Sequence, residues 1–164
     1  MSSSVKEGAG YLLGFIVFIC AIPLLMFLLA GRPAAGGLRL SSLIVCTLAG
    51  VGLSVWSIVY MKQKGHGNPM DAFNHQLAPR TSRLMTEGPY SLCRNPMLLG
   101  VFIFYAGLQL YLLSWRSLAV FAVFVLIMGL QVKREEQRLE RDFGAAYRAY
   151  CKRTPALIPR LRKR

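Results

Sequence analysis

Four long runs without a charged residue dominate this 164-residue sequence. They cover residues 11–30, 40–61, 96–114 and 117–132. A helix rises about 1.5 Å per residue and needs about 20 apolar residues to cross the roughly 30 Å hydrocarbon core of a bilayer. We therefore predict an all-α integral-membrane bundle of about four transmembrane helices, with no sheet. The fourth run has only sixteen residues, and we expect its helix to continue beyond the membrane from Lys133 onward.

The composition excludes a soluble domain of ordinary type. Hydrophobic residues make up 54% of the chain and charged residues only 16%, whereas an average soluble domain has about 25% charged residues. A soluble chain of this size cannot bury so much apolar surface. We interpret residues 11–30 as a retained helix rather than a cleaved signal sequence, because its apolar core is too long for one. We expect a single domain over residues 1–164.

The basic residues are placed asymmetrically along the chain. There are 20 Lys and Arg against 7 Asp and Glu, a formal charge of +13. With the N-terminus in the cytoplasm, seventeen of the basic residues fall in cytoplasmic segments, and the outer loops keep Arg32, Arg39 and Arg116. The positive-inside rule favours this orientation, with both termini cytoplasmic and the protein in the inner (plasma) membrane. No nucleic-acid-binding module accompanies the charge, so attraction to anionic lipid is the better explanation.

Two polar segments remain for chemistry, residues 62–95 and 133–160, and this topology places both on the cytoplasmic face. The third and fourth runs are separated by Trp115-Arg116, which predicts a tight helical hairpin. Apolar residues recur at helical spacing between Val132 and Tyr150, which predicts an amphipathic C-terminal helix packed on the membrane interface or on the first polar segment. Pro155 and Pro159 should end it.

Two motifs in these polar segments resemble a known superfamily. Residues 88–100, GPYSLCRNPMLLG, are similar to the G-x-Y-x-x-x-R-H/N-P-x-Y-x-G signature of the isoprenylcysteine carboxyl methyltransferase and phospholipid methyltransferase superfamily. Glu135-Glu136 and the residues that follow resemble its second signature, E-E-x-x-L-x-x-x-F-G-x-x-Y-x-x-Y. Shorter stretches at residues 65–69 and 84–88 are similar to small prokaryotic members. The resemblance covers roughly residues 40–160.

The resemblance implies methyl transfer from S-adenosylmethionine, enclosed on the cytosolic side, to a lipophilic acceptor that enters from the bilayer. The implied cofactor contacts are Leu84, Met85, Tyr90, Asn95, Pro96, Met97, Leu98 and Glu135, and in the phospholipid-methylating branch also Glu136. Asn95 stands where histidine is commonest, and Leu98 replaces the usual tyrosine. Gln131 falls where the isoprenylcysteine enzymes have an arginine assigned to the substrate, which weighs against a prenylated-peptide carboxylate as acceptor.

The chemistry of these side chains agrees with such a cofactor. A carboxylate such as Glu135 attracts an ammonium or sulfonium group, whereas Arg94 or the Asn95 amide can bind a carboxylate. Methyl transfer is an in-line displacement in which alignment and exclusion of water supply most of the acceleration. No catalytic residue is identified, and Arg94, Asn95 and Gln131 are the candidates. His66 and His75 are possible bases for an amine or thiol acceptor. No metal site is expected.

Simpler explanations exist for several of these residues. Glu135 and Glu136 could be solvated helix charges, with Glu135 paired to Arg138 three residues on. Arg94 could be a topology anchor, and Asn95-Pro96 could simply cap the third span.

Other residues have a packing explanation. Tyr147 and Tyr150 are expected to pack rather than bind a ligand, and Gly50 and Gly52 to let helices approach closely.

Two other functions also stay open at this point. One is a nicotinamide-dependent reductase, because sterol reductases share a similar signature, although this chain is much shorter than they are. The other is a non-catalytic membrane protein with a degenerate cofactor pocket, for which Leu98 and Gln131 are the hints. The identity of the acceptor and the oligomeric state cannot be read from the sequence.

Overall fold

The protein is an elongated helical bundle. The computed structural model describes residues 12–14, 16–31, 36–65, 71–72, 75–76 and 83–159. In chain order its elements are the π-helix η1 (Ile16–Ala21), α2 (Ile22–Ala30), α3 (Gly37–Gly65), strands β1 (Asp71–Ala72) and β2 (His75–Gln76), the 3₁₀-helix η2 (Gly88–Ser91), α4 (Pro96–Leu112) and α5 (Trp115–Arg153). The helical architecture agrees with the prediction. Only one short antiparallel pair, β1 with β2, departs from it among the described residues.

Three of the helical segments described are long and apolar enough to cross a membrane, namely Leu12–Ala30, Gly37–Gly65 and Trp115–Arg153. Outward-facing leucines agree with a lipid environment, since Leu28, Leu48 and Leu126 are 67%, 70% and 68% exposed and such large apolar surfaces are rare on soluble monomers. Helix α4 is also apolar but has only 17 residues, about 25 Å of helix. The number of four spans therefore stays a prediction.

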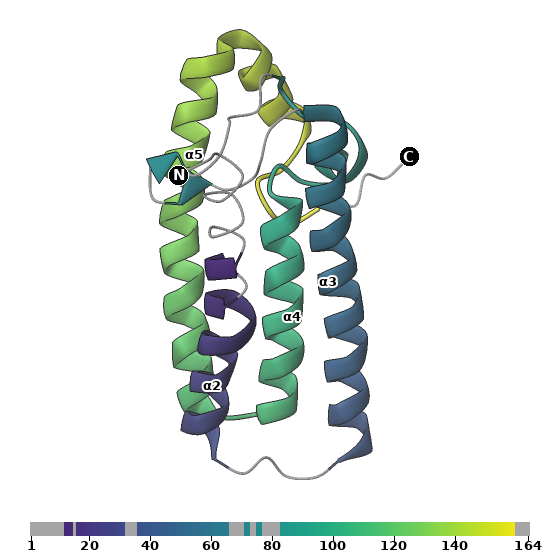
Figure 1. The fold of residues 1–164 in the computed structure, drawn as a ribbon, viewed down its shortest axis with the longest axis vertical. Coiled ribbons are helices and arrows are strands. Elements are labelled where there is room, and N and C mark those ends of the chain that lie inside the picture. Colours follow the sequence, from purple (N-terminus) through teal and green to yellow (C-terminus); the bar gives the residue numbers. More distant parts are fainter. Residues whose placement is uncertain are drawn as a thin grey trace.

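Helices α3 and α4 lie side by side along the bundle (Figure 1) with their backbones almost in contact. A side chain at Gly50 would collide with the carbonyl oxygen of Gly100, and a side chain at Gly100 would collide with Gly50 and Ser54. Farther along, Gly107 lies against Cys46. Close approach through small residues is a common way for membrane helices to associate. The prediction is confirmed for Gly50 but wrong for Gly52, which is exposed and where an added side chain would meet no atom within 4 Å.

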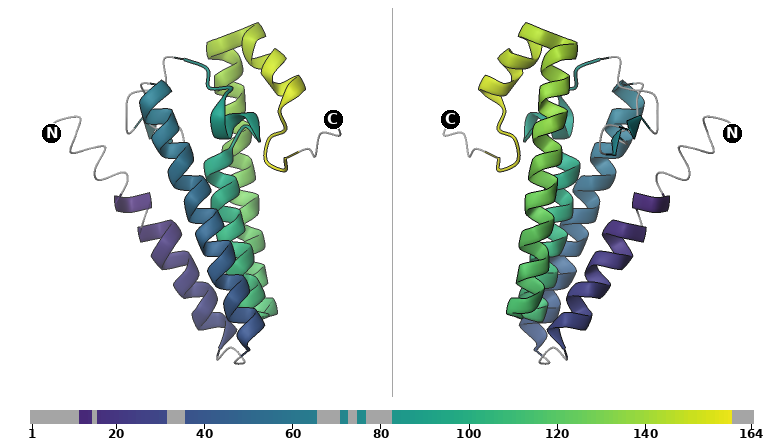
Figure 2. Two further views of the ribbon diagram at one scale, coloured as in Figure 1. Left: turned by 90° about the vertical axis from the view of Figure 1, so that its right-hand side faces the viewer. Right: turned by 90° about the vertical axis from the view of Figure 1, so that its left-hand side faces the viewer.

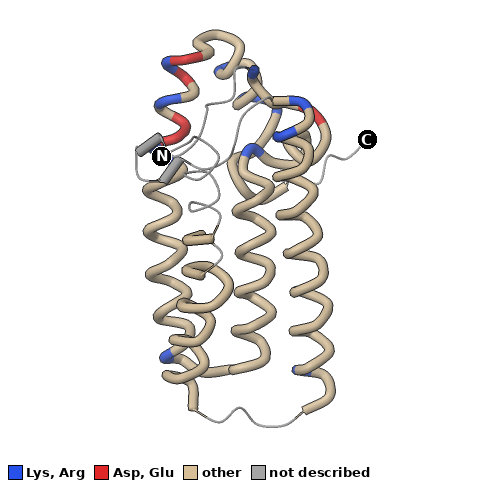
Figure 3. Tube along the Cα trace, viewed as in Figure 1, with Lys and Arg blue, Asp and Glu red and all other residues tan. Residues whose placement is uncertain are grey.

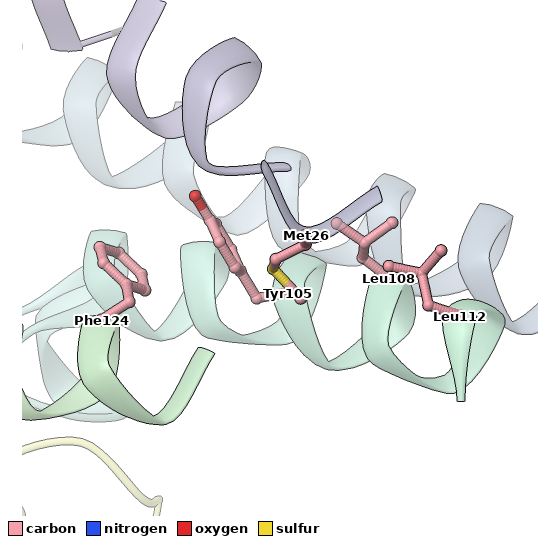
Figure 4. Packing of buried hydrophobic residues seen from close by; sticks show 5 residues of the cluster. All are labelled: Met26, Tyr105, Leu108, Leu112 and Phe124. Atoms are coloured by element: carbon pink, nitrogen blue, oxygen red, sulfur yellow. The ribbon is translucent and has the colours of Figure 1, made fainter. Parts of the chain in front are cut away.

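The largest side chains pack where α2, α4 and α5 meet. The buried cluster in Figure 4 consists of Met26, Tyr105, Leu108, Leu112 and Phe124. The Tyr105 ring stacks on Phe124 with ring centroids 4.8 Å apart, and its hydroxyl donates a 2.9 Å hydrogen bond to the carbonyl oxygen of Phe18 in η1. In a π-helix that carbonyl would pair with the N–H five residues on, which is Pro23 and has none. Tyr105 thus supplies a donor that the proline withholds.

The hairpin between α4 and α5 turns at Leu113-Ser114, slightly earlier than predicted. Leu113 adopts a left-handed conformation (φ 44°) and donates its N–H to Gln109. Trp115, placed in the turn by the sequence, instead begins α5. The turn is closed by the amide of Gln109, which donates to the carbonyl of Ser114 and accepts from the hydroxyl of the fully buried Ser117.

Helix α5 is longer than the membrane is thick. It runs without a break past Lys133, as predicted, and then turns back at Gly144, whose φ of 51° and ψ of −121° are not helical. Figure 2 shows the result as two arms, residues 115–143 and 145–153, with the second arm descending toward the start of α4. The predicted amphipathic segment is therefore the continuation of the last span rather than a separate helix.

Charged residues gather at the end of the bundle that holds this kink (Figure 3). Among the described residues of the helices, Arg39 and Arg116 lie at the opposite end, at the starts of α3 and α5. The two polar segments with the sequence motifs thus share one end of the molecule.

Candidate functional site

The first motif leads the chain across this end of the bundle into α4. Its opening residue, Gly88, has φ 59°, and a side chain there would collide with the ring of Tyr60 from α3. Glycine is required at this position for both reasons. The 3₁₀-helix η2 that follows buries Tyr90, which is 7% exposed, and Cys93 is fully buried. The last residue of the motif, Gly100, belongs to the α3–α4 contact described above.

The chain beyond α5 pairs with this motif through its backbone. The N–H of Arg94 donates to the carbonyl of Pro155 at 2.9 Å, and the N–H of Asn95 donates to that of Ala156 at 3.1 Å. The side-chain amide of Asn95 donates to the same Ala156 oxygen at 3.0 Å. Asn95 occupies the N-cap position of α4, as the simpler explanation requires, but makes no capping hydrogen bond. Its amide nitrogen fastens the C-terminal tail instead.

The second arm of α5 carries two buried tyrosines, Tyr147 and Tyr150, on the side of the first motif. Tyr147 and Tyr150 are 3% and 4% exposed, in agreement with the predicted packing role. The hydroxyl of Tyr150 donates a 2.6 Å hydrogen bond to the backbone carbonyl of Tyr90. Burial raises the pKa of Tyr150, so it stays a neutral donor. This hydrogen bond joins the two motifs directly.

The paired acids of the second motif lie on the first arm of α5 and have different surroundings. A carboxylate oxygen of Glu136 is 2.6 Å from the guanidinium of Arg94, a short charge-assisted contact. Glu135 is 3.4 Å from Arg138, the pairing considered in the simpler explanation. Burial and the neighbouring charge of Glu136 raise the pKa of Glu135.

Glu135 faces Tyr90. Burial, and next the Glu135 carboxylate, raise the pKa of Tyr90, so the phenol is neutral and can donate a hydrogen bond. A carboxylate with a raised pKa is one whose charge is not fully compensated by the protein. Such a group is suited to a cationic ligand.

Leu84 and Met85 lie elsewhere at this end. They line a small hollow of about 140 Å³ against the end of α3, together with Tyr60, Lys64, Arg83, Thr86 and Glu87. In the first turn of α4, Pro96 is buried whereas Met97 and Leu98 are half-buried, and the carbonyl of Met97 accepts a hydrogen bond from Ser54. Gln131 lies one turn before Glu135 on α5.

The structure thus brings together Tyr90, Arg94, Asn95, Glu135 and Glu136. A cleft of about 440 Å³ opens between the arms of α5 and holds Glu136 but neither Glu135 nor Tyr90; it is lined by Lys133, Glu136, Gln137, Glu140, Tyr147, Arg148, Cys151 and Lys152.

Part of the predicted site lies outside the described residues. This applies to His66, to the stretch 66–69 that resembles small prokaryotic members, and to the side chain of His75. Within the described ranges, no group of three or more His, Cys, Asp or Glu side chains is placed to hold a metal ion.

Sequence reasoning missed three contributors to the site: Cys93, the Tyr150 hydroxyl and the backbone of Pro155-Ala156. Tyr150 belongs to the second motif, so the motif itself was the available signal. The tail contacts are made by backbone atoms 61 residues away in sequence, and no side-chain pattern announces them.

Comparison with known proteins identifies a family that the sequence matches. A sequence profile described as "Phospholipid methyltransferase" matches residues 39–146, well over half of the chain. The matched region contains both acids, Tyr90 and the whole first motif, and it ends just after the kink in α5.

Several curated proteins are also similar. The nickel-cobalt-cadmium resistance protein of Alcaligenes xylosoxydans xylosoxydans is 35% identical over 83 residues, 50% of this chain and 38% of that protein. The protein-S-isoprenylcysteine O-methyltransferase of Schizosaccharomyces pombe is 28% identical over 104 residues, 61% of this chain and 44% of that protein. Protein-S-isoprenylcysteine O-methyltransferase B of Arabidopsis thaliana is 33% identical over 92 residues, 54% of this chain and 47% of that protein. The chain spans less than half the length of these relatives.

Proposed function

The chain belongs to the phospholipid methyltransferase family, and from this premise we propose that it transfers a methyl group from S-adenosylmethionine to a lipophilic or membrane-associated acceptor. The acceptor group is a carboxylate, an amine or a thiol. The observation that supports this proposal best is the direct contact between the two motifs, made by the Tyr150–Tyr90 hydrogen bond and the Arg94–Glu136 ion pair. When bound, S-adenosylmethionine supplies an electrophilic methyl group.

The residues at this end of the bundle fit such a cofactor. The Glu135 carboxylate, whose pKa is raised by burial and by Glu136, would attract the cofactor's ammonium or sulfonium group. Tyr90 offers a buried aromatic surface with a neutral hydroxyl. The first turn of α4 from Pro96 to Leu98 would add an apolar wall, whereas Leu84 and Met85 line the separate hollow against α3. Asn95 would meet the cofactor through its carbonyl oxygen, because its amide nitrogen is hydrogen-bonded to Ala156.

The protein's contribution to the reaction is alignment and exclusion of water. The second arm of α5 and the tail cover the first motif through Tyr150, Pro155 and Ala156, so one side of the site is closed by protein. The apolar helices bring a lipophilic acceptor to the same end from the bilayer. Gln131 offers no cation for a carboxylate acceptor, which favours an amine or thiol.

The charge distribution supports a cytoplasmic site. The basic end of the molecule holds both motifs (Figure 3), and basic residues near a membrane mark its cytoplasmic side. We place both termini and the site in the cytoplasm and the protein in the inner membrane. S-adenosylmethionine is made and used in that compartment's aqueous phase.

Binding of S-adenosylmethionine tests the proposal most directly. Titration calorimetry of the protein in detergent should show saturable binding of S-adenosylmethionine and S-adenosylhomocysteine. Glu135→Ala should abolish that binding while the protein stays folded, and Glu140→Ala on the exposed face of the same helix should not change it. Absence of binding to the folded wild-type protein contradicts the proposal, and binding of a nicotinamide cofactor instead would identify a reductase.

The acceptor is identified in a second experiment. Membranes that contain the protein are incubated with methyl-labelled S-adenosylmethionine, and the label is sought in lipid, small thiols and protein. Membranes with the Glu135→Ala variant provide the background. Label in one fraction above that background names the acceptor class, and label in none while the cofactor still binds indicates a non-catalytic binding protein.

A further inference from the structure

The two adjacent acids of the second motif are held differently by the protein. Glu136 forms a 2.6 Å ion pair with Arg94, and the two side chains are only 28% and 14% exposed. Glu135 lies at the longer distance of 3.4 Å from Arg138. Consecutive residues of an α-helix point about 100° apart, so the two carboxylates face different parts of the molecule.

Their electrostatic neighbours agree with that divergence. After burial, the charge of Glu135 contributes to raising the pKa of Tyr90. The charge of Glu136, again after burial, contributes to raising the pKa of Tyr147 in the second arm of α5, and Arg94 opposes that shift. Glu136 therefore lies between the first motif and the second arm and lines the cleft there, whereas Glu135 does not line that cleft.

The Arg94–Glu136 pair also has a distinct place among the contacts that hold the first motif. The hydrogen bonds from Tyr150, Pro155 and Ala156 reach the motif from the second arm and the tail. The ion pair joins the motif to the first arm, one residue away from Glu135. It thus links the first motif to the part of α5 that carries Glu135.

We propose that Glu136 is a positioning residue: by holding Arg94 it fixes the first arm of α5, and with it the neighbouring Glu135, against the first motif, and it does not itself contact the cofactor. This inference rests on the proposed function, and it separates two acids that the family resemblance would assign to one role. Glu136 cannot turn to a ligand without leaving a mostly buried guanidinium without its counter-charge, which is unfavourable.

The test is a double-mutant cycle on ligand affinity, with S-adenosylhomocysteine as the probe. Arg94→Gln and Glu136→Gln should each weaken its binding about tenfold, and the double variant should bind no more weakly than the weaker single variant, because both changes break one interaction. Strictly additive losses would show two independent contacts with the ligand and would overturn the inference. Glu140→Gln, which breaks the exposed Arg148–Glu140 pair, is the matched control and should leave affinity unchanged.

A second ligand keeps the result independent of general damage to the site. 5′-Methylthioadenosine keeps the nucleoside and the thioether but lacks the ammonium and carboxylate of S-adenosylhomocysteine. If Glu136 acts through Glu135, Glu136→Gln and Glu135→Gln should both spare binding of 5′-methylthioadenosine. An equal loss for the two ligands would contradict a positioning role. Failure of the wild-type protein to bind S-adenosylhomocysteine is a different result, which removes the proposed function itself.

Discussion

Two contacts of the molecule are made by different kinds of residue. One joins α3 to α4, and the other joins α5 to the first motif. In the first, Gly50 and Gly100 bring two backbones together, and the only side chain among these three residues is the small hydroxymethyl group of Ser54. In the second, the partners are polar side chains and a few backbone groups, namely the Tyr150 hydroxyl, the Arg94–Glu136 pair and the tail.

This difference in contact type indicates which residues matter for folding and which matter for the candidate site. A backbone-to-backbone contact has no free space, so one added atom must move a whole helix. A hydrogen bond or ion pair can be removed singly, and the loss is limited to that interaction and the group left unpaired. We therefore expect changes in the α3–α4 contact to affect folding, and changes at the α5 contact to affect ligand binding.

The largest effect should come from Gly100→Ala. The new methyl group would overlap Gly50 and Ser54, and overpacking of this kind costs about 1–3 kcal/mol and occasionally more. Gly52→Ala is the matched control, because nothing lies within 4 Å of that position and alanine favours a helix by about 1 kcal/mol over glycine. Thermal unfolding in detergent should thus shift in opposite directions. Equal shifts would mean that the two helices are not in close contact.

The next largest effect concerns Glu135 and pH. Because burial and Glu136 raise the pKa of Glu135, the carboxylate should take up a proton at a higher pH than an exposed glutamate does. Affinity for S-adenosylhomocysteine should fall as the pH is lowered through that pKa. Calorimetry across mildly acidic to neutral pH checks this, and Glu135→Gln should bind weakly with no such pH dependence.

The raised pKa of Glu135 affects the stability of the ligand-free protein in the opposite direction to ligand affinity: lower pH weakens binding but favours the folded state. A folded-state pKa above the unfolded value contributes stability at low pH that is lost as the pH rises through the folded pKa. The ligand-free Glu135→Gln variant should therefore be more stable than wild type at neutral pH, with the difference vanishing in acid. A variant that is less stable at neutral pH would show that Glu135 is a structural residue.

Tyr150→Phe should have a moderate effect on both properties. It leaves the buried carbonyl of Tyr90 without its 2.6 Å partner, at a cost of about 1–3 kcal/mol. Because this hydrogen bond holds the first motif, affinity for S-adenosylhomocysteine should also fall severalfold. Unfolding and calorimetry measure the two effects, and unchanged affinity would show that the motif keeps its shape without α5.

Tyr105→Phe should have the smallest effect, on stability alone. It removes a tyrosine hydroxyl, as Tyr150→Phe does, but in the middle of the bundle, where that hydroxyl donates to the Phe18 carbonyl. Hydrogen bonds between membrane helices contribute about 0.6 kcal/mol on average. Unfolding should shift slightly, and ligand affinity should equal that of wild type. A change in affinity as large as that of Tyr150→Phe would contradict the separation of fold from site.

The helices could be predicted well from the sequence, because a helix surrounded by lipid needs a continuous run of apolar residues. The predicted spans 40–61 and 96–114 correspond to Gly37–Gly65 and Pro96–Leu112, and the continuation of the fourth run past Lys133 is confirmed. The π-helical turn at Ile16–Ala21 was not predicted, and one of its carbonyl groups, that of Phe18, is hydrogen-bonded to Tyr105, which is distant in sequence.

The candidate site was harder to predict than the bundle. The motifs placed Tyr90, Asn95 and the two acids at one end of the molecule, but sequence spacing could not show which acid binds Arg94. It could not reveal the reversal at Gly144 either, because a glycine within a helical pattern is compatible with a continuous helix. The pairing of Asn95 with Ala156 is a backbone contact and depends on the folded path alone.

The reversal of α5 at Gly144 also sets two helix dipoles head to tail. The second arm ends at Arg153, and its tail hydrogen-bonds to the residues immediately before α4, which begins at Pro96. A helix carries partial negative charge at its C-terminus and partial positive charge at its N-terminus. The end of one helix therefore attracts the beginning of the other across the Arg94–Asn95 junction. Because φ at Gly144 is positive, a side chain there would strain the backbone and disfavour the reversal that brings these two helix ends together.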